Sequence, residues 1–510
     1  MGDIQTIREL LGQGGAHAAA LLAPERAPLV HGGLREQIDR SVEALNGLGL
    51  GRNDRVAIVL PNGPEMAAAF AAIASAATTA PLNPGYRADE HRFYLSDLAA
   101  RALLVERGSD SPAVAVAAEL GIPRIELFRE PDAPAGRFEL ALAPGSPAPD
   151  GGAEQGFAQP GDVALVLHTS GTTSRPKQVP LTHANVCASA ANIARTLRLG
   201  VDDRCLNVMP LFHIHGLMAA VLASLGSGGS LYCTPGFNAL RFFGWLDDAH
   251  ATWYTAVPTM HQAILSRAER NKEAIGRANL RFIRSSSASL PPQVFAELED
   301  VFKVPVVEAY AMTEASHQMC SNPLPPGERK PGSVGPAAGP EVAILDDAGE
   351  LLPAGAVGEI AIRGSNVTAG YVNNDAANAT AFTNGWFRTG DQGVMDADGY
   401  VRISGRLKEI INRGGEKVSP LEIDAVLMDH PAIQQICTFA MPHDKLGEEV
   451  AAAVVLRENA EVSERELREF AASRLADFKV PRKWVFVPEI PKGATGKIQR
   501  IGLAAKLGLA

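Results

Sequence analysis

The sequence contains few cysteines, and their spacing does not pair them. There are five in 510 residues, at positions 187, 205, 233, 320 and 437, and none belongs to a Cys-x-x-Cys pair. This pattern argues against a disulfide framework and against a zinc ribbon. We therefore predict reduced, mostly buried thiols, as in a cytoplasmic protein.

The chain also lacks an excess of positive charge and a long apolar run. Its formal net charge of -10 argues against a general nucleic-acid-binding protein. The amino terminus, "MGDIQTIREL", has no apolar signal core, and the most apolar helical stretch, residues 65–81, is too rich in alanine to favour a membrane. We expect a cytoplasmic location and no nucleic-acid or membrane partner. The sequence leaves open a monomer or a homodimer.

Short apolar runs alternate with helical patterns through the first three hundred residues. The runs at 55–61, 204–210, 230–235 and 280–287 each precede such a pattern. This alternation predicts parallel sheets flanked by helices, hence the α/β fold class. Residues 129–162, rich in Pro, Gly and Ala, are typical of a surface connection, so we expect two α/β subdomains.

The pattern of apolar and turn-forming residues changes after Pro340. Short strands with turn signals predict a small β unit over about 340–407, which completes an N-terminal domain of residues 1–407. Residues 408–510 predict a small α+β C-terminal domain. One of its helices opens at a Ser-x-x-Glu capping box, at residues 463–466.

A cluster of hydrogen-bond donors follows the apolar run "DVALVL". The stretch "HTSGTTSRPKQVP" (168–180) should lie at the carboxyl end of a strand, where open α/β sheets bind ligands. Its donors suit an anionic phosphate chain, and Thr182 caps the helix that follows. The donor positions are Thr169, Ser170, Gly171, Thr172, Thr173 and Lys177. Pro176 and Gln178 flank Lys177, which excludes a Walker motif. A merely solvated polar loop is the alternative.

Seven segments together resemble the landmarks of the adenylate-forming superfamily, which includes acyl-CoA synthetases, luciferases and peptide-synthetase adenylation domains. In chain order they are "TSGTTSRPKQVPLTH" (169–183), "PLFHIHG" (210–216), "RSSSASL" (284–290), "EAYAMTEAS" (308–316), "GWFRTGD" (385–391), "SGRLKEIINRGGEKVSPLEID" (404–424) and "PKGATGKIQR" (491–500). The resemblance implies ATP, Mg²⁺ and coenzyme A as cofactors and co-substrates, a small carboxylic acid as substrate, and a mobile C-terminal domain.

The resemblance also assigns roles in the nucleotide site. The residues assigned to the adenine pocket are Ser287, Ala288, Ser289, Glu308, Ala309 and Tyr310. Thr313 and Glu314 match the catalytic pair at the α-phosphate, with Glu314 also binding Mg²⁺. The other assigned residues are Asp391 and Arg406 at the ribose, Lys417 near the triphosphate and the catalytic Lys497. The alternatives are purely structural roles: a core tyrosine at 310, a turn aspartate at 391 and a surface lysine at 497.

Two further residues concern the second half of the reaction. Lys408 matches the family hinge, about which the C-terminal domain rotates between an adenylating and a thioester-forming state. Gly415 matches the glycine of the pantetheine tunnel, where a Cβ would obstruct the thiol.

The acid site departs from the pattern of fatty-acyl and aryl ligases. Serines stand at 286 and 287, and "YAMTE" replaces "YGMTE", so side chains close the space that glycines leave open. His213, His215, His317 and Arg284 add imidazoles and a charge, which suit a small acid with a second polar or charged end.

These segments resemble the oxalate–CoA ligases within the superfamily. The resemblance implies an acid-binding set of His213, His215, Ser287 and His317. A metal pair of His213 and His215 on one strand face, or a purely structural His215, is the alternative. For the whole protein the alternatives are a medium-chain fatty or aromatic acid–CoA ligase, a carrier-protein-loading adenylation enzyme and a non-catalytic nucleotide-binding module.

Overall fold

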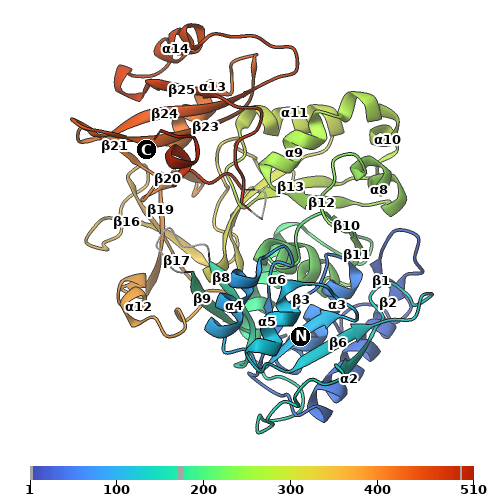
Figure 1. Cartoon of the computed structure of the whole chain (residues 1–510). Helices are drawn as coiled ribbons and strands as arrows, with labels where there is room; N and C mark the ends of the chain where they lie inside the picture. Colours follow the sequence, from blue (N-terminus) through green and yellow to red (C-terminus); the bar gives the residue numbers. More distant parts are fainter. Residues whose placement is uncertain (1–3, 170–175, 494–496, 510) are drawn as a thin grey trace.

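The computed structural model describes residues 4–169, 176–493 and 497–509. Within these residues the strands form four sheets, of eight, seven, five and five strands. In Figure 1 the two larger sheets lie in the lower part of the view and to the right, and the last sheet lies at the top. The mixed architecture agrees with the predicted α/β class.

The eight-stranded sheet has the order β15-β14-β13-β12-β10-β11-β1-β2. Strands β14 to β1 of this order run parallel, while β15 and β2 are antiparallel edges. The bounds are β1 Ala19–Leu22, β2 Leu29–Val30, β10 Arg204–Asn207, β11 Ser230–Cys233, β12 Trp253–Ala256, β13 Phe282–Ser286, β14 Val306–Met312 and β15 His317–Ser321.

The seven-stranded sheet has the order β7-β6-β5-β3-β4-β8-β9, with antiparallel edges β7 and β9 on a parallel centre. The bounds are β3 Arg55–Val59, β4 Thr78–Pro81, β5 Ala102–Glu106, β6 Arg124–Phe128, β7 Glu139–Leu142, β8 Val163–Thr169 and β9 Lys177–Thr182. Strand β9 lies between the donor-rich loop and the helix that Thr182 caps, which the sequence did not indicate.

Helices surround the two larger sheets. Their bounds are α1 Ile7–Leu10, α2 His31–Gly47, α3 Pro64–Ala74, α4 Ala88–Asp97, α5 Pro112–Glu119, α6 His183–Thr196, η1 His215–Leu222, α7 Ala223–Gly226, α8 Phe242–Ala249, α9 Pro258–Leu265, η2 Ala268–Asn271, α10 Lys272–Arg277, α11 Pro292–Phe302 and η3 Thr313–Ala315.

Helix α3 is buried on all sides. Every residue of it except Glu65 is buried, and it contacts both β4 and β11, one strand from each sheet. Alanine side chains allow this close approach from several directions. The helix predicted over 65–81 is therefore too long: it ends at Ala74, and Thr78–Pro81 form β4. The Thr78 and Thr79 hydroxyls donate to backbone carbonyls of β8, which fixes the strand there.

A five-stranded antiparallel sheet follows, with the order β16-β17-β19-β18 and β20 paired to β19. It agrees with the small β unit that the sequence predicts. The bounds are β16 Glu341–Leu345, β17 Val357–Arg363, α12 Asp375–Ala381, β18 Phe382–Thr383, β19 Trp386–Met395 and β20 Val401–Arg406.

Residues 411–509, called the C-terminal unit here, form the last sheet and its helices. The sheet order is β22-β21-β24-β23, with β25 parallel to β24. The bounds are β21 Ile411–Arg413, β22 Glu416–Val418, α13 Pro420–Leu427, β23 Ile433–His443, β24 Gly447–Leu456, α14 Glu464–Ala472, η4 Asp477–Lys479, β25 Lys483–Phe486 and α15 Leu503–Lys506. The predicted capping box of Ser463 and Glu466 opens α14.

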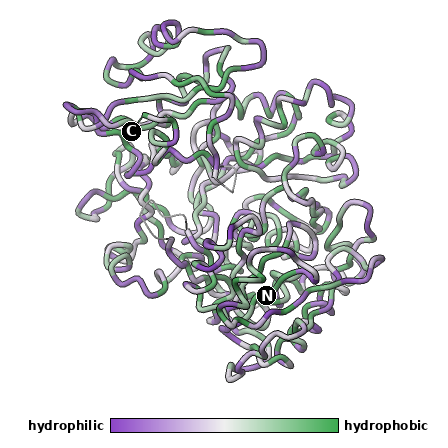
Figure 2. Tube along the Cα trace, in the orientation of Figure 1, coloured by the Kyte–Doolittle hydropathy of each residue, from purple (hydrophilic) through white to green (hydrophobic). Residues whose placement is uncertain are grey.

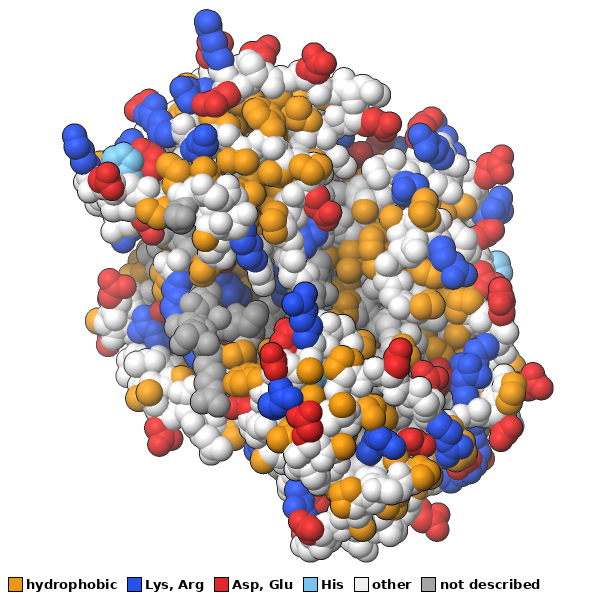
Figure 3. All heavy atoms as spheres, in the orientation of Figure 1, with side chains coloured by type: hydrophobic (Ala, Val, Ile, Leu, Met, Phe, Trp, Pro, Cys, Tyr) orange, Lys and Arg blue, Asp and Glu red, His pale blue; other side chains and the backbone are white. Residues whose placement is uncertain are grey.

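The C-terminal unit packs against α9 and α11. Gln293 of α11 donates to the Ala425 carbonyl of α13 at 3.2 Å, and Gln262 of α9 donates to the Gln434 carbonyl at 3.3 Å. Figure 2 shows green strands inside both lobes and purple outer loops. Figure 3 shows a hollow on this face between the C-terminal unit above and the larger sheets below. The packing places the C-terminal unit over the carboxyl ends of β13 and β14.

The prediction of free, buried cysteines is met. All five cysteines are free and buried. Among the helices of the described residues, none has the length and apolar character needed to cross a bilayer.

Candidate active site

The two residues predicted to hold the ribose lie opposite each other on neighbouring strands, β19 and β20. Asp391 of β19 lies opposite Arg406 of β20, with 3.4 Å between Asp391 Oδ1 and Arg406 Nε. The Tyr310 hydroxyl, from β14, donates to Asp391 Oδ2. Burial raises the pKa of Asp391, and the charge of Arg406 opposes that rise. The pair therefore keeps a buried carboxylate beside the ring predicted to stack on adenine.

Glu308 fixes the loop of residues 287–289, which is predicted to line the adenine pocket. Its Oε1 accepts a hydrogen bond from the Leu290 amide at 2.8 Å, and burial raises its pKa to about 8. Ser287 in this loop has a φ of +75°, while Ala288 and Ser289 are exposed. Ala309 is buried, and its carbonyl accepts from Ser286 Oγ at 2.9 Å. Glu308 therefore holds the loop in position through its hydrogen bond with Leu290.

Glu314 and Lys177 share a neighbour that the sequence did not reveal. The Tyr371 hydroxyl donates to Glu314 Oε1 at 2.9 Å, and Lys177 Nζ lies 4.2 Å from the centre of the Tyr371 ring. Burial raises the pKa of Glu314, and the charges of Arg406 and Lys177 oppose this. Tyr371 sits in "TAGYVNN", which carries only a turn signal, so its role could not be read locally.

The donor-rich loop begins and ends at paired residues. Thr169 at the end of β8 lies opposite Lys177 at the start of β9. The predicted phosphate-binding residues Ser170, Gly171, Thr172 and Thr173 lie outside the described residues. Thr313 opens the short helix η3 directly after β14, next to Glu314. The two ends of the loop, the Glu314 carboxylate and the pair of Asp391 and Arg406 therefore surround one region.

Lys497 is half-buried and interacts with both halves of the site. Its ammonium group interacts electrostatically with Asp391 and Arg406 on one side and with His213 and His317 on the other. Burial and the charge of Arg406 lower its pKa to about 8, and Asp391 opposes this. The Gly493 amide donates to the Lys497 carbonyl at 2.8 Å, which anchors the residue. A surface position for Lys497 is excluded in this arrangement.

The histidine pair does not lie on a strand, so the metal-pair alternative is wrong in its geometry. His215 begins the helix η1 instead. Its Nδ1 is 3.0 Å from Ser287 Oγ and its Nε2 is 2.7 Å from Thr255 Oγ1, so both nitrogens are occupied by hydroxyls. His213 Nδ1 accepts from the His215 amide at 3.3 Å. In the described part of the chain, no group of three or more His, Cys, Asp or Glu could hold a metal.

His317 differs from its neighbours because its ring nitrogens lack hydrogen-bond partners among the described residues. It is fully buried, and within the described residues neither ring nitrogen forms a hydrogen bond. Its ring lies edge-on to His215, with 5.0 Å between the ring centres. Burial lowers the pKa of His213, His215 and His317, so these imidazoles are neutral. Buried polar groups normally find partners, so an unpaired imidazole here points to a ligand.

The backbone around the acid pocket is strained. His317 has a φ of +104° and Ser316 a φ of +49°, in addition to Ser287. Side chains other than glycine rarely adopt such angles, at a cost of about 1–3 kcal/mol each, and strain of this kind is typical of functional sites.

Three predicted residues lie apart from these groups. Lys408 is exposed in the turn between β20 and β21, and Lys417 is exposed on β22. Gly415 has a φ of +99°, but a Cβ there would meet no heavy atom within 4 Å, so its backbone angle and not crowding requires glycine here. The sequence assigned no role to Thr255 or Gln318, whose contacts with His215 and Arg284 depend on the sheet.

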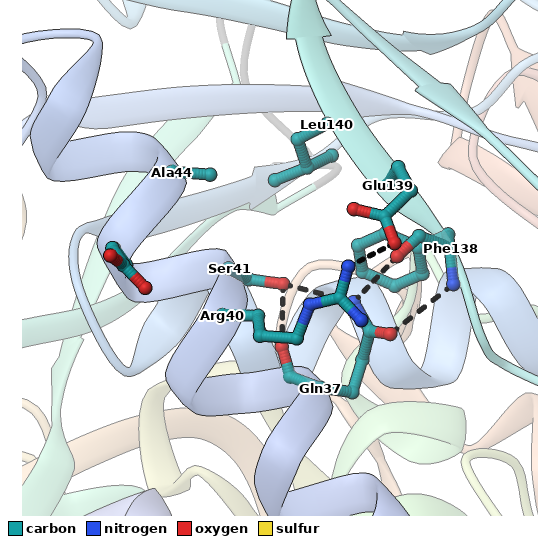
Figure 4. Close-up of a pocket in the computed structure, with 8 residues that line it drawn as sticks. Gln37, Arg40, Ser41, Ala44, Phe138, Glu139 and Leu140 are labelled. Carbon is teal, nitrogen blue, oxygen red and sulfur yellow. Dashed lines mark hydrogen bonds and ion pairs between the residues drawn. The ribbon is translucent and has the colours of Figure 1, made fainter.

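Two cavities lie outside this site. One of about 210 Å³ lies between α2 and β7, where Gln37 donates to the Phe138 carbonyl at 3.0 Å and Arg40 pairs with Glu139 (Figure 4). The other, of about 290 Å³, contains the ion pair of Arg26 and Glu65. Each cavity has one ion pair among its lining residues, and neither cavity contains a predicted site residue.

Comparisons with known proteins agree with this geometry. The model of the AMP-binding enzyme family matches residues 14–372, and the model of the C-terminal domain of AMP-binding enzymes matches residues 422–497. The chain is 47% identical over 488 residues to a probable CoA ligase of Humulus lupulus, covering 94% of this chain and 92% of the relative. It is 46% identical over 486 residues to an oxalate–CoA ligase of Arabidopsis thaliana, covering 94% of each.

Solved structures extend the comparison to the fold. ATP-bound MatB from Rhodopseudomonas palustris superposes with a TM-score of 0.87 at 29% identity, covering 98% of each chain. Both lobes of this chain therefore have counterparts in a protein that was crystallised with ATP.

Proposed function

The chain belongs to the family of AMP-binding enzymes, and we propose that it is an ATP-dependent ligase that joins oxalate to coenzyme A. The reaction is oxalate + ATP + CoA to oxalyl-CoA + AMP + diphosphate. The similarity to an oxalate–CoA ligase over 94% of the chain supports the proposal. The arrangement of Lys497 between the nucleotide residues and the imidazoles supports it independently.

The first step would form an acyl-adenylate. A carboxylate oxygen of oxalate attacks the α-phosphorus of ATP, and diphosphate leaves with the electrons of the broken P–O bond. Lys497, which interacts with both Asp391 and His317, would stabilise the charge on the oxygen between acid and phosphorus. Mg²⁺ bound with the nucleotide would neutralise phosphate charge, with the buried Glu314 carboxylate as its protein ligand.

The second step would use the same cleft in another arrangement. The thiolate of CoA attacks the acyl carbon, the thioester bond forms, and AMP leaves. Rotation of the C-terminal unit about Lys408 would withdraw Lys497 and bring Gly415 to the thiol. The exposed turn that carries Lys408, between two separate sheets, suits such a rotation.

One observation carries the choice of acid: the buried, unpaired ring of His317. Oxalate brings a second carboxylate to accept a hydrogen bond from this ring, and from the Ser287 hydroxyl nearby. An alkyl chain or an aromatic ring would leave these polar groups unpaired, which opposes its binding. The pocket therefore favours oxalate over the medium-chain and aromatic acids.

A panel of acids tests the proposal. Diphosphate release is measured with oxalate, malonate, acetate, hexanoate and benzoate, with and without CoA, and the thioester is identified by mass. We expect kcat/KM for oxalate to exceed that for acetate by about 100-fold, which corresponds to the upper end of the cost of leaving a buried polar group unpaired. Hexanoate or benzoate outperforming oxalate severalfold would contradict the assignment.

The same panel distinguishes a CoA ligase from a carrier-protein-loading enzyme and from a non-catalytic module. Adenylate formation without transfer to free CoA would favour the carrier-protein-loading enzyme, and absence of AMP with every acid would favour the non-catalytic module. The cytoplasmic location and the monomeric or homodimeric state stay predictions.

A further inference from the structure

Arg284 carries a buried charge that no carboxylate of the described residues compensates. It lies in β13 and is fully buried. Across the described ranges, no Asp or Glu forms an ion pair with it, and its Nε has no hydrogen-bond partner. Arg500 shows the usual arrangement, since this half-buried arginine pairs with Asp424. A buried charge without a partner is costly, and burial lowers the pKa of Arg284 accordingly.

The contacts of Arg284 are all with neutral groups of the acid pocket. Its Nη2 donates to Gln318 Oε1 at 3.2 Å, while Nη1 lies 3.4 Å from His215 Nε2 and 3.4 Å from Thr255 Oγ1. The guanidinium group is therefore held directly behind His215. Its charge acts on the pocket, because it also interacts with His317 and lowers the pKa of that ring.

These contacts favour one tautomer of His215. A guanidinium group only donates hydrogen bonds, so His215 Nε2, which faces Arg284 and Thr255, is the unprotonated nitrogen. The proton is then on Nδ1, which donates to Ser287 Oγ at 3.0 Å. With its oxygen accepting from His215, the Ser287 hydroxyl directs its own proton outward, as a donor to an anion.

We propose that Arg284 is a positioning and specificity-determining residue, whose buried charge acts through His215 and Ser287 to select acids with a second negative charge. This inference rests on the proposed function of the site as an acid pocket. A doubly charged acid supplies the negative charge that no described Asp or Glu supplies to Arg284. A singly charged acid of the same size leaves the Arg284 charge uncompensated and is discriminated against.

The test compares oxalate with glyoxylate, which has one carboxylate and an uncharged second end. Arg284→Met should lower the ratio of kcat/KM for oxalate to that for glyoxylate by about 100-fold, chiefly through KM for oxalate, with KM for ATP nearly unchanged. Arg284→Lys, which keeps a charge, should retain most of the ratio. An unchanged ratio in Arg284→Met, or equal loss of activity on both acids, would overturn the proposal.

A second variant removes the effect of the charge without removing the arginine. Gln318→Glu places a carboxylate against Nη2, where the Gln318 Oε1 contact is 3.2 Å, and should lower the same ratio. The amide also donates to the Ala338 carbonyl at 3.1 Å, so the readout is the ratio and not the activity. A retained preference for oxalate in Gln318→Glu would count against the proposal.

Thermal unfolding separates this role from a structural one. Without ligand, Arg284→Met should unfold at the same or a higher temperature than the wild type, because an uncompensated buried charge is lost. The increase in unfolding temperature that oxalate gives the wild type should disappear. A lower unfolding temperature for the ligand-free variant would assign Arg284 a structural role and reject the proposal.

The outcomes also separate this proposal from the proposed function. If the wild type makes oxalyl-CoA while both variants keep its selectivity, the inference about Arg284 alone is wrong. If the wild type prefers malonate, the proposed substrate is wrong. The comparison of oxalate with glyoxylate is then replaced by a comparison of malonate with acetate. The selectivity for charge in the Arg284 variants is then judged on that pair.

Discussion

The hydroxyl of Tyr310 and the carboxylate of Asp391, eighty-one positions apart in the chain, are joined by a hydrogen bond. The bond links β14 of the largest sheet to β19 of the small β unit. It brings the residue predicted to stack on adenine and the residue predicted to hold the ribose into one nucleotide site. The carboxylate and the hydroxyl can be tested separately.

Asp391→Asn should weaken ATP binding. The substitution removes the charge that attracts Arg406 and leaves a weaker acceptor for the ribose hydroxyls, so KM for ATP should rise by about 10-fold or more, as for hydrogen bonds to charged groups. Steady-state kinetics at saturating oxalate measures this. Tyr310→Phe is the matched control: it keeps the ring and should change KM for ATP by less than about threefold. Similar KM values for Asp391→Asn and the wild type would argue against the ribose role.

Lys497→Ala should impair the first half-reaction selectively. Loss of one positioned donor typically costs about 100-fold to 1,000-fold in rate, so oxalate-dependent diphosphate release should fall by that factor. Thioester formation from preformed oxalyl-adenylate should be nearly unaffected. Lys492→Ala removes an exposed lysine paired with Glu489 and is the control. Equal loss in both half-reactions would contradict the rotation about Lys408.

Adenylation should decline as the pH rises through about 8. The active form of Lys497 is the protonated ammonium, which is fully present below its pKa of about 8 and is lost above it. The pH profile of kcat/KM for ATP reports this group in the free enzyme. Bound phosphates favour the charged form, so the decline in kcat should lie at higher pH. Lys497→Arg should shift the decline in kcat/KM upward. A flat profile from pH 7 to about 9.5 would contradict the assignment.

Arg500→Met should destabilise the C-terminal unit. Arg500 pairs with the buried Asp424, donates to the Thr438 carbonyl at 3.2 Å and lies 3.8 Å from Glu409 in the turn that carries Lys408. Removing one partner of a buried ion pair leaves the other charge unpaired, which costs about 3–5 kcal/mol. Denaturant unfolding measures the loss.

The control for this prediction is an exposed ion pair. Arg468→Ala breaks the pair with Glu464 on the surface of α14 and should change the free energy of unfolding by less than about 1 kcal/mol. Adding Asp424→Asn to Arg500→Met should recover part of the stability, because the unpaired carboxylate is removed. Equal effects of Arg500→Met and Arg468→Ala would show that burial of the pair contributes nothing.

Much of the fold could be predicted because it depends on local patterns. The apolar runs at 55–61 and 280–287 contain the strands Arg55–Val59 and Phe282–Ser286, and the Ser-x-x-Glu pattern at Ser463 forms its capping box, since each signal involves neighbours in sequence. The antiparallel strand β9 was missed because its partner, β8, lies across a loop, and its own residues contain a proline and three polar side chains. Helix α3 was predicted too long because alanine gives no boundary signal.

The sequence by itself determined the family landmarks, their order and the chemical types of the site residues, because these are written in short segments. Only the tertiary structure decided that His215 lies on a helix with both nitrogens occupied and that His317 has none occupied. It alone placed the Tyr371 hydroxyl on Glu314 and, within the described part of the chain, gave Arg284 neutral hydrogen-bond partners in place of a carboxylate. The physical reason is that hydrogen bonding and charge compensation depend on distances between strands and helices far apart in the chain, which residue spacing does not contain.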